Sequence, residues 1–405
     1  MLKNKYTIES LMKELNVIKY PAQWENIFEA AMDSYDKNGC KLVDKGFLCK
    51  MNEEYHIFTY RFEQVLCAAE QIRGNEPLAR YLKLLETVIT DRLNYSLSMI
   101  ELPEAPDAVD PLGYDLVALF VFPPTVPATF ESYRAHNVPE DIIELTTKEY
   151  EICIDDFERR FGKPGFNISC LSWGHHIINA DLLRIGRFNF EMRQEFPGHI
   201  GVFRNKQGDH KTLMDSIKLH RSGFAFGIPE YQDEEGSYYA DLAETDTYWE
   251  GYPVIDEGCA SNEKIRLNKD EWTSVLKNGD PVISIHIPVG ESLAPEICEK
   301  AYMEADANIR KWYPEFNYKA YICISWLMDP QLSKLLKPGS NITAFQRKFT
   351  RFPFVSSGNA VFKFVFFKQC KTLQELPENT SLERVLKKHY LDGHYIYEPG
   401  GFFFT

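Results

Sequence analysis

Apolar residues recur at helical spacing throughout the first part of the chain, up to residue 160. Trp24, Phe28 and Met32 follow one another four residues apart, which places them on one face of a helix. The same spacing recurs in further segments, and proline near the start of two of them suits a first helical turn. The pattern predicts helices over residues 10–15, 21–35, 55–71, 77–91, 127–135 and 146–160.

The pattern changes after the cluster Gly162-Lys-Pro-Gly165, because glycine and proline interrupt regular structure. We place a domain boundary there, between a helical N-terminal domain over residues 1–162 and a second domain over residues 163–405. Aromatic and alternating runs predict strands over residues 166–173, 182–195 with a bulge at Gly186, 199–204, 222–228 and 251–255. Residues 269–276 fit a helix, for which Asn268 is a suitable cap.

From residue 281 onwards, strands and helices follow one another in a regular order. A strand over residues 282–287 enters a short loop, and a long helix over residues 294–313 follows. The elements predicted next are a strand 318–326, helices 330–336 and 342–349, an aromatic central strand 360–367, a helix 381–390 and a terminal strand 395–404. This order implies an α+β or α/β fold, in which a helical N-terminal domain precedes a mixed β-sheet flanked by helices.

The loop between strand 282–287 and the long helix has the layout of an anion-binding turn. The first turn of a helix leaves backbone N–H groups unpaired, and its dipole adds about half a positive charge there. Gly290 lets the backbone approach a ligand closely, and Ser292 can cap the helix. The candidate binding residues are Ile287, Val289, Gly290, Glu291, Ser292 and Leu293.

Several motifs resemble those of a known family. They are His286-Ile-Pro, Gly290-x-x-Leu293, Cys323-x-Ser-Trp-Leu-Met-Asp-Pro330, Ser340-Asn-Ile-x-x-Phe-Gln-x-x-Phe349 and Gly400-Gly. With the order of the elements, they resemble bacterial two-domain acyltransferases, in which a helical N-terminal part precedes a GNAT-like C-terminal part. The resemblance covers nearly the whole chain. It implies that the loop binds the diphosphate of coenzyme A, and that the pantetheine arm lies where the next strand splays away.

The activity that the resemblance implies is transfer of an acyl group from acyl-CoA to an amine of a small molecule or peptide. The loop departs from the usual family pattern, R/Q-x-x-G-x-G/A, because no arginine precedes Gly290 and Glu291 adds a negative charge. The basic residues that can serve the loop instead are Lys300, Arg310, Arg347 and Lys348. The alternative is a catalytically inactive GNAT-like protein with a binding or regulatory role.

Acyl transfer to an amine needs a base that accepts the ammonium proton and a donor for the leaving thiolate. His286, on the strand that enters the loop, is the candidate base, and a hydrogen-bonded core histidine is the alternative. Cys323 and Ser325 are catalytic candidates on one face of the next strand, although a buried, inert thiol is the alternative for Cys323. Arg187 and Glu191 either pair with each other or line a cleft.

Composition and charge indicate which kinds of partner and which cell compartment suit this protein. The net charge of −14 argues against a nucleic-acid partner and suits a cationic acceptor such as an amine. No run approaches the roughly 18 apolar residues of a membrane span. Nine scattered cysteines without C-x-x-C, and an N-terminus without an apolar signal core, indicate a cytoplasmic protein with reduced thiols. We expect no metal, because His-Glu-x-x-His is absent and His175 and His176 would point to opposite faces of a strand.

Overall fold

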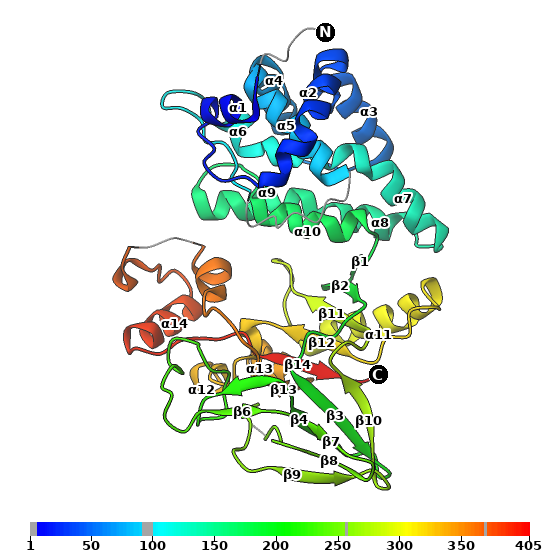
Figure 1. The fold of residues 1–405 in the computed structure, drawn as a ribbon, viewed down its shortest axis with the longest axis vertical. Helices are drawn as coiled ribbons and strands as arrows, with labels where there is room; N and C mark the ends of the chain where they lie inside the picture. The colour runs from blue at the N-terminus through cyan, green and yellow to red at the C-terminus, as the bar shows by residue number, and fades with distance from the viewer. Residues whose placement is uncertain (1–5, 91–99, 256–257, 368–370) are drawn as a thin grey trace. The chain divides into compact units, whose positions relative to one another are not determined.

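The computed structural model describes residues 6–90, 100–255, 258–367 and 371–405 (Figure 1). The chain divides into two compact units, Met1–Leu183 and Arg184–Thr405. The dividing point lies beyond the Gly162–Gly165 cluster, because the helix that follows this cluster packs with helices of the first unit.

The first unit is helical. Its α-helices are α1 (Ile8–Glu14), α2 (Glu25–Asn38), α3 (Lys45–Tyr55), α4 (Phe62–Gly74), α5 (Glu76–Thr90), α6 (Leu112–Leu116), α7 (Val126–Ala135), α8 (Glu140–Thr147), α9 (Glu149–Phe161) and α10 (Ile168–Ile178). Short turns η1 (Ala22–Trp24), η2 (Lys41–Val43), η4 (Val117–Val121) and η5 (Pro123–Thr125) connect them. The predicted helix over residues 55–71 is wrong in its first turns. Helix α3 ends at Tyr55, and His56 follows in the left-handed conformation with a φ of 48°.

The strand predicted over residues 166–173 is wrong, because Ile168–Ile178 form helix α10. Asn167 caps it, because the Asn167 side chain accepts a hydrogen bond from the Ser169 amide at 2.9 Å. Its buried residues, Leu171, Gly174 and Ile177, are three apart and therefore share one helical face. The short apolar run could not distinguish a strand from a helix, and packing against the other helices decided the outcome.

One stretch of the described residues, Leu112–Ala135, is long and apolar enough to cross a membrane by length and composition alone. It comprises α6, η4, η5 and α7 in direct succession. Because 67% of its most apolar window is buried inside the protein, it has the burial of a core segment.

The second unit is built on a six-stranded sheet with the order β1-β2-β11-β12-β14-β13. The strands are β1 (Leu182–Ile185), β2 (Phe188–Arg193), β11 (Val282–His286), β12 (Tyr321–Ile324), β13 (Thr350–Phe352) and β14 (Gly400–Phe403). Strands β11 and β12 are parallel, whereas β2 with β11, β12 with β14 and β13 with β14 are antiparallel. The sheet is therefore mixed, as the sequence predicts.

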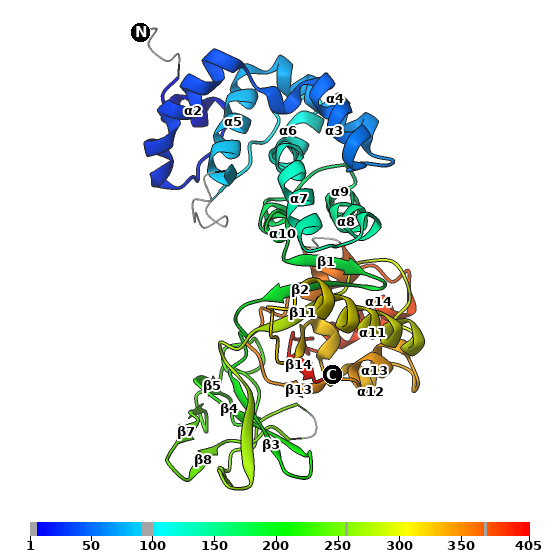
Figure 2. The same cartoon turned by 90° about the vertical axis from the view of Figure 1, so that its right-hand side faces the viewer.

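The described chain between β2 and β11, residues 194–255 and 258–281, forms a separate set of small sheets, which we call the β insertion (Figure 2). Its strands are β3 (Ile200–Asn205), β4 (His210–Met214), β5 (Ile217–Leu219), β6 (Tyr238–Ala240), β7 (Ala243–Glu244), β8 (Tyr248–Gly251), β9 (Ile265–Asn268) and β10 (Trp272–Lys277). Two predictions fail here. Residues 222–228 form turns, and residues 269–276 form a turn and then β10, because pairing with β3 overrides the helical spacing of Trp272 and Leu276.

Helices complete the second unit. They are α11 (Pro295–Trp312), η6 (Trp326–Met328), α12 (Leu332–Leu335), α13 (Asn341–Gln346), η7 (Phe362–Phe366), η8 (Leu373–Glu375) and α14 (Ser381–Leu391). The aromatic run 360–367 is a π-helical turn and not the predicted central strand. Its Phe366 packs against Leu386 and Tyr390 of α14, so this run belongs to a helical core outside the sheet.

The two faces of the sheet are covered by different elements. Phe188 of β2 stacks on Tyr302 of α11 with ring centroids 5.3 Å apart, so α11 covers that face. On the other face, Val282, Ile322 and Phe402 belong to one buried cluster with residues of the β insertion. The α+β fold, with a helical N-terminal part and a mixed sheet, is confirmed, and α11 covers one face of that sheet while the β insertion packs on the other.

Candidate functional site

Residues 287–294 connect the end of β11 to the start of α11. Gly290 has a φ of 138°, and nothing lies within 4 Å of the point that its Cβ would occupy. Ser292 does not cap α11 as predicted, because its Oγ accepts a hydrogen bond from Asn341 Nδ2 at 2.7 Å and ties the loop to α13. The N-cap is Ala294, which has no side-chain cap bond. The loop is therefore open at Gly290, and its side chains leave the start of α11 uncapped.

Strands β11 and β12 part just before this loop. The last pair in their register is Ser284 with Ile322. Beyond that pair, β11 stays bonded to β2 through His286, and β12 stays bonded to β14 through Ile324. The two strands therefore separate while each keeps its other neighbour. The facing strand edges present backbone polar groups that do not pair with each other, so an extended chain with its own amides can bond there.

A buried arginine lies against the loop. Arg187, in the turn between β1 and β2, is 5% exposed, and its Nη1 donates to the carbonyl oxygen of Pro288 at 2.8 Å. Its Nε has no hydrogen-bond partner among the described residues. Gly186 permits the turn, because it has a φ of 54° and its Cβ would lie 3.3 Å from Ala301 of α11. Burial, and then the charge of Arg184, lower the pKa of Arg187.

The four basic residues that the sequence offers for the loop are engaged with other groups. Lys300 faces Glu304, Arg310 bonds Asp306, Arg347 bonds the carbonyl of Thr343 and Lys348 bonds Glu299. Val289, Glu291 and Ser292 of the loop are exposed, and Ile287 and Leu293 are half-buried. Because Glu291 is exposed, solvent and salt screen its negative charge.

His286 is held by charged residues of β2. Its Nε2 lies 2.7 Å from a carboxylate oxygen of Glu191, and Arg193 donates to the same carboxylate at 3.1 Å. Glu191 is 4% exposed, whereas 35% of the His286 side chain is exposed. Because a carboxylate only accepts hydrogen bonds, Nε2 carries the proton in this contact. In the neutral ring, Nδ1 is then the nitrogen that can accept a proton.

Cys323 lies on the opposite face of the sheet from His286, as the register of β11 with β12 requires. It is fully buried, and burial raises its pKa to about 12, so a reactive thiolate is disfavoured. Ser325 follows β12 and caps η6, with its Oγ accepting the Leu327 amide at 3.2 Å. Of the two candidates on this strand, Ser325 lies beside the parting strands, whereas Cys323 lies in the buried core.

Reasoning from the sequence singled out Arg187 and Glu191 but did not find the groups that they contact. Arg187 and Glu191 bond neither each other nor a common group among the described residues, and each serves a different part of β11 and its loop. The only sequence signal is that polar and charged residues alternate with apolar ones from Arg187 through the strand Phe188–Arg193. The pairing itself depends on the register between two strands that the β insertion separates.

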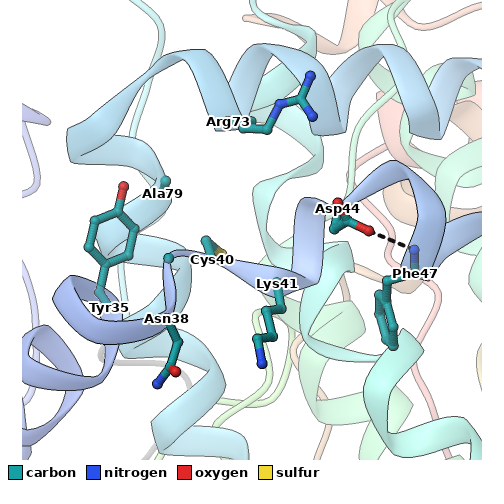
Figure 3. A pocket seen from close by; sticks show the side chains of 9 residues that line it. Tyr35, Asn38, Cys40, Lys41, Asp44, Phe47, Arg73 and Ala79 are labelled. Atoms are coloured by element: carbon teal, nitrogen blue, oxygen red, sulfur yellow. Dashed lines mark hydrogen bonds between the residues drawn. The ribbon is translucent and has the colours of Figure 1, made fainter.

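The first unit contains a pocket of about 560 Å³ between α2, η2 and α4 (Figure 3). Figure 3 shows that the charged ends of Lys41 and Arg73 point away from each other. Asp44 accepts the Phe47 amide at 2.8 Å as the cap of α3, and burial raises the pKa of Cys40 to about 11. The polar groups of this pocket therefore do not converge on one ligand position.

The histidine pair of the first unit lies on helix α10, so the argument that required a strand does not apply to it. His176 Nδ1 lies 3.0 Å from Asp181 Oδ1. Within the part of the chain that the structure describes, no group of three or more His, Cys, Asp or Glu residues is arranged to hold a metal ion.

A family model of the GNAT-like C-terminal domain matches residues 182–403, which is more than half of the chain. The chain belongs to this family. The GNAT-like domain begins at β1 and includes the β insertion, the loop and the last strand, β14. No curated protein matches the chain in sequence.

Solved structures resemble the whole chain, including its helical part. An acyltransferase in complex with decanoyl-CoA and teicoplanin is 17% identical with a TM-score of 0.62, and the match covers 97% of this chain and 98% of that one. An acyltransferase mutant in complex with octanoyl-CoA is 17% identical with a TM-score of 0.63, and 98% of each chain is covered. The expected combination of a helical N-terminal part with a GNAT-like domain is thereby confirmed as a fold.

Proposed function

We propose that this GNAT-like protein transfers an acyl group from acyl-CoA to an amine of a small molecule or peptide. One observation carries the proposal. Strands β11 and β12 part directly before an open loop at a helix N-terminus, and a histidine bonded to a buried carboxylate ends the strand that enters this loop. Similar structures that hold CoA, decanoyl-CoA or octanoyl-CoA support the choice of donor.

In this proposal, the amides of Gly290–Leu293 bind the diphosphate of the donor, since they precede the positive end of the α11 dipole. The pantetheine arm lies between β11 and β12, where its amides bond the strand edges that no longer pair with each other. The thioester then lies near the open end of the parting strands, beside His286 and Ser325.

His286 acts as the base in the proposed reaction. Its Nδ1 accepts a proton from the ammonium group of the acceptor, while Glu191 holds Nε2–H and stabilises the ring once it is charged. The neutral amine nitrogen forms a bond to the thioester carbon, and the bond from carbon to sulfur breaks. The Ser325 hydroxyl, which accepts the Leu327 amide, donates its hydrogen to the leaving sulfur and takes up the second proton that the nitrogen loses as the amide forms. The proton held by His286 then passes to solvent. The products are an amide and free CoA.

The donor half of the proposal is tested with the full chain by calorimetry with CoA and octanoyl-CoA. Binding should also raise the melting temperature by mass action when the ligand is present well above its Kd. Gly290→Glu, which places a charged side chain in the loop, should abolish the rise. If neither ligand binds the unaltered protein, the proposed function is wrong.

The transfer half is tested by chromatographic measurement of CoA release from octanoyl-CoA in the presence of a panel of primary amines and amino sugars. Chromatography is preferred to thiol reagents, because the nine cysteines of the chain also react with them. His286→Asn should lower turnover by about 10²-fold or more, the usual contribution of a general base. The control His56→Asn alters an exposed histidine in the first unit and should leave turnover unchanged. Binding of octanoyl-CoA without amine-dependent release would favour a regulatory role instead.

A further inference from the structure

Arg187 has an unusual environment for an arginine. It is 5% exposed, and its only hydrogen bond among the described residues runs from Nη1 to the carbonyl of Pro288. No carboxylate of the described chain forms an ion pair with it, and its buried Nε has no partner. Buried arginines are normally paired, because an uncompensated charge in the protein interior is costly.

The position of Arg187 explains what can compensate this charge. Its guanidinium touches the loop that precedes α11, and the charge of Glu291 and the thiol of Cys298 in α11 both act on its pKa. Burial and the neighbouring Arg184 act more strongly and lower that pKa, so the nearby negative charge does not offset the cost of burying the guanidinium. An anion that binds the loop would arrive beside an arginine that has no counter-ion.

The hydrogen bond to Pro288 alone does not account for this arrangement. A neutral donor would hold the Pro288 carbonyl equally well, without the cost of a buried charge. The turn that carries Arg187 is also fixed independently, since Gly186 packs against Ala301 of α11. The guanidinium therefore contributes something that a hydrogen bond to the loop does not require, namely its positive charge.

We propose that Arg187 is the residue that neutralises the diphosphate of the acyl-CoA donor at the loop formed by residues 287–294. This inference rests on the proposed function and assigns to the β1–β2 turn the positive charge that the loop lacks. A charge-assisted contact to phosphate is about twice as strong as a neutral one, so Arg187 should account for a factor of about 10 to 100 in donor affinity.

The test compares two donors by calorimetry, octanoyl-CoA and octanoyl-pantetheine, which keeps the acyl chain and the arm but has no phosphate. In Arg187→Gln, the Kd of octanoyl-CoA should rise about tenfold or more, whereas the Kd of octanoyl-pantetheine should not change. The melting temperature without ligand should stay the same or rise, because the variant removes a buried, unpaired charge. A merely structural arginine would lower that temperature and weaken both ligands equally.

The matched control is Arg310→Gln, which removes one positive charge near the C-terminal end of α11, where Arg310 pairs with Asp306. It should leave both Kd values unchanged. If Arg187→Gln does not fold, Arg187→Met removes the same charge while filling a similar volume. Equal affinity of octanoyl-CoA for the variant and the unaltered protein would overturn the inference and leave the proposed function intact. Failure of the unaltered protein to bind octanoyl-CoA would overturn the proposed function itself.

Discussion

Asp329 is expected to make the stability of the protein depend on pH in an unusual direction. It lies in the Ser-Trp-Leu-Met-Asp-Pro motif and is 1% exposed. Its carboxylate accepts the amides of Gln331 at 2.8 Å and Tyr397 at 2.7 Å, which joins the turn after β12 to the segment that enters β14. Burial outweighs these bonds and raises the pKa of Asp329 to about 6.

The direction and size of this pH effect follow from the difference between the pKa of Asp329 in the folded and in the unfolded chain. The pKa of Asp329 rises from 3.8 in the unfolded chain to about 6 in the folded one, which corresponds to ~3 kcal/mol of unfolding free energy. Between these values, the folded protein holds a proton that the unfolded chain releases. The contribution of Asp329 to stability is therefore complete below about pH 4, and it is lost as the pH rises through about 6.

The assay is urea unfolding of the unaltered protein and of Asp329→Asn, followed by circular dichroism, at pH values from 4 to 7. Asparagine stays neutral and loses one acceptor oxygen, and this loss costs the same at every pH. Relative to the unaltered protein, the variant should gain about 2–2.5 kcal/mol between pH 4 and pH 7. Asp241→Asn, at an exposed position, is the control and should show no such gain. A pH-independent difference for Asp329→Asn would refute the reasoning.

Two further predictions concern the site and the sheet. Glu191→Gln should lower turnover by about tenfold, because the partner that stabilises the charged His286 ring is lost, while calorimetry should show unchanged affinity for octanoyl-CoA. A change in affinity without a change in turnover would contradict that assignment. Gly400→Ala should destabilise the protein by about 1–3 kcal/mol in urea unfolding, because its Cβ would lie 2.1 Å from the buried ring of Phe352. Gly74→Ala, where nothing lies within 4 Å, is its control, and equal effects of the two would contradict the packing argument.

Much of the fold could be predicted where one periodicity was clear over a long segment. Helix α11 and strand β11 lie close to their predicted ranges, because a long amphipathic helix after a buried strand is an unambiguous pattern. Helix α10 and the turn η7 were predicted as strands, since short apolar or aromatic runs fit either structure. In both cases the partners that decide the structure lie far away in the sequence: Phe122 lies close against Gly174 of α10, and Tyr390 packs against η7.

In the candidate site, too, features within one short segment could be predicted, whereas contacts between distant segments could not. The loop and His286 are contiguous in sequence, so their order was visible from the residues alone. Their partners were not, because Arg187 lies 101 residues from Pro288 and Glu191 lies 95 residues from His286. Charged residues on β2 predict some polar contact, but the contact that each one makes depends on strand pairing.

The register of β2 against β11 shows why these two charges serve different purposes. The strands are antiparallel with Asn189 opposite His286, so the residues before Asn189 lie toward the loop and those after it lie toward the start of β11. Arg187 consequently reaches Pro288, and Glu191 stays beside the histidine. The β1–β2 turn thus places a positive charge where an anionic donor is proposed to bind, and β2 places a negative charge where a base must become protonated. A shift of one residue in this register would turn Glu191 to the other face of the sheet and move Arg187 along the strand from Pro288, so both roles depend on the pairing of two strands that the β insertion separates in the sequence.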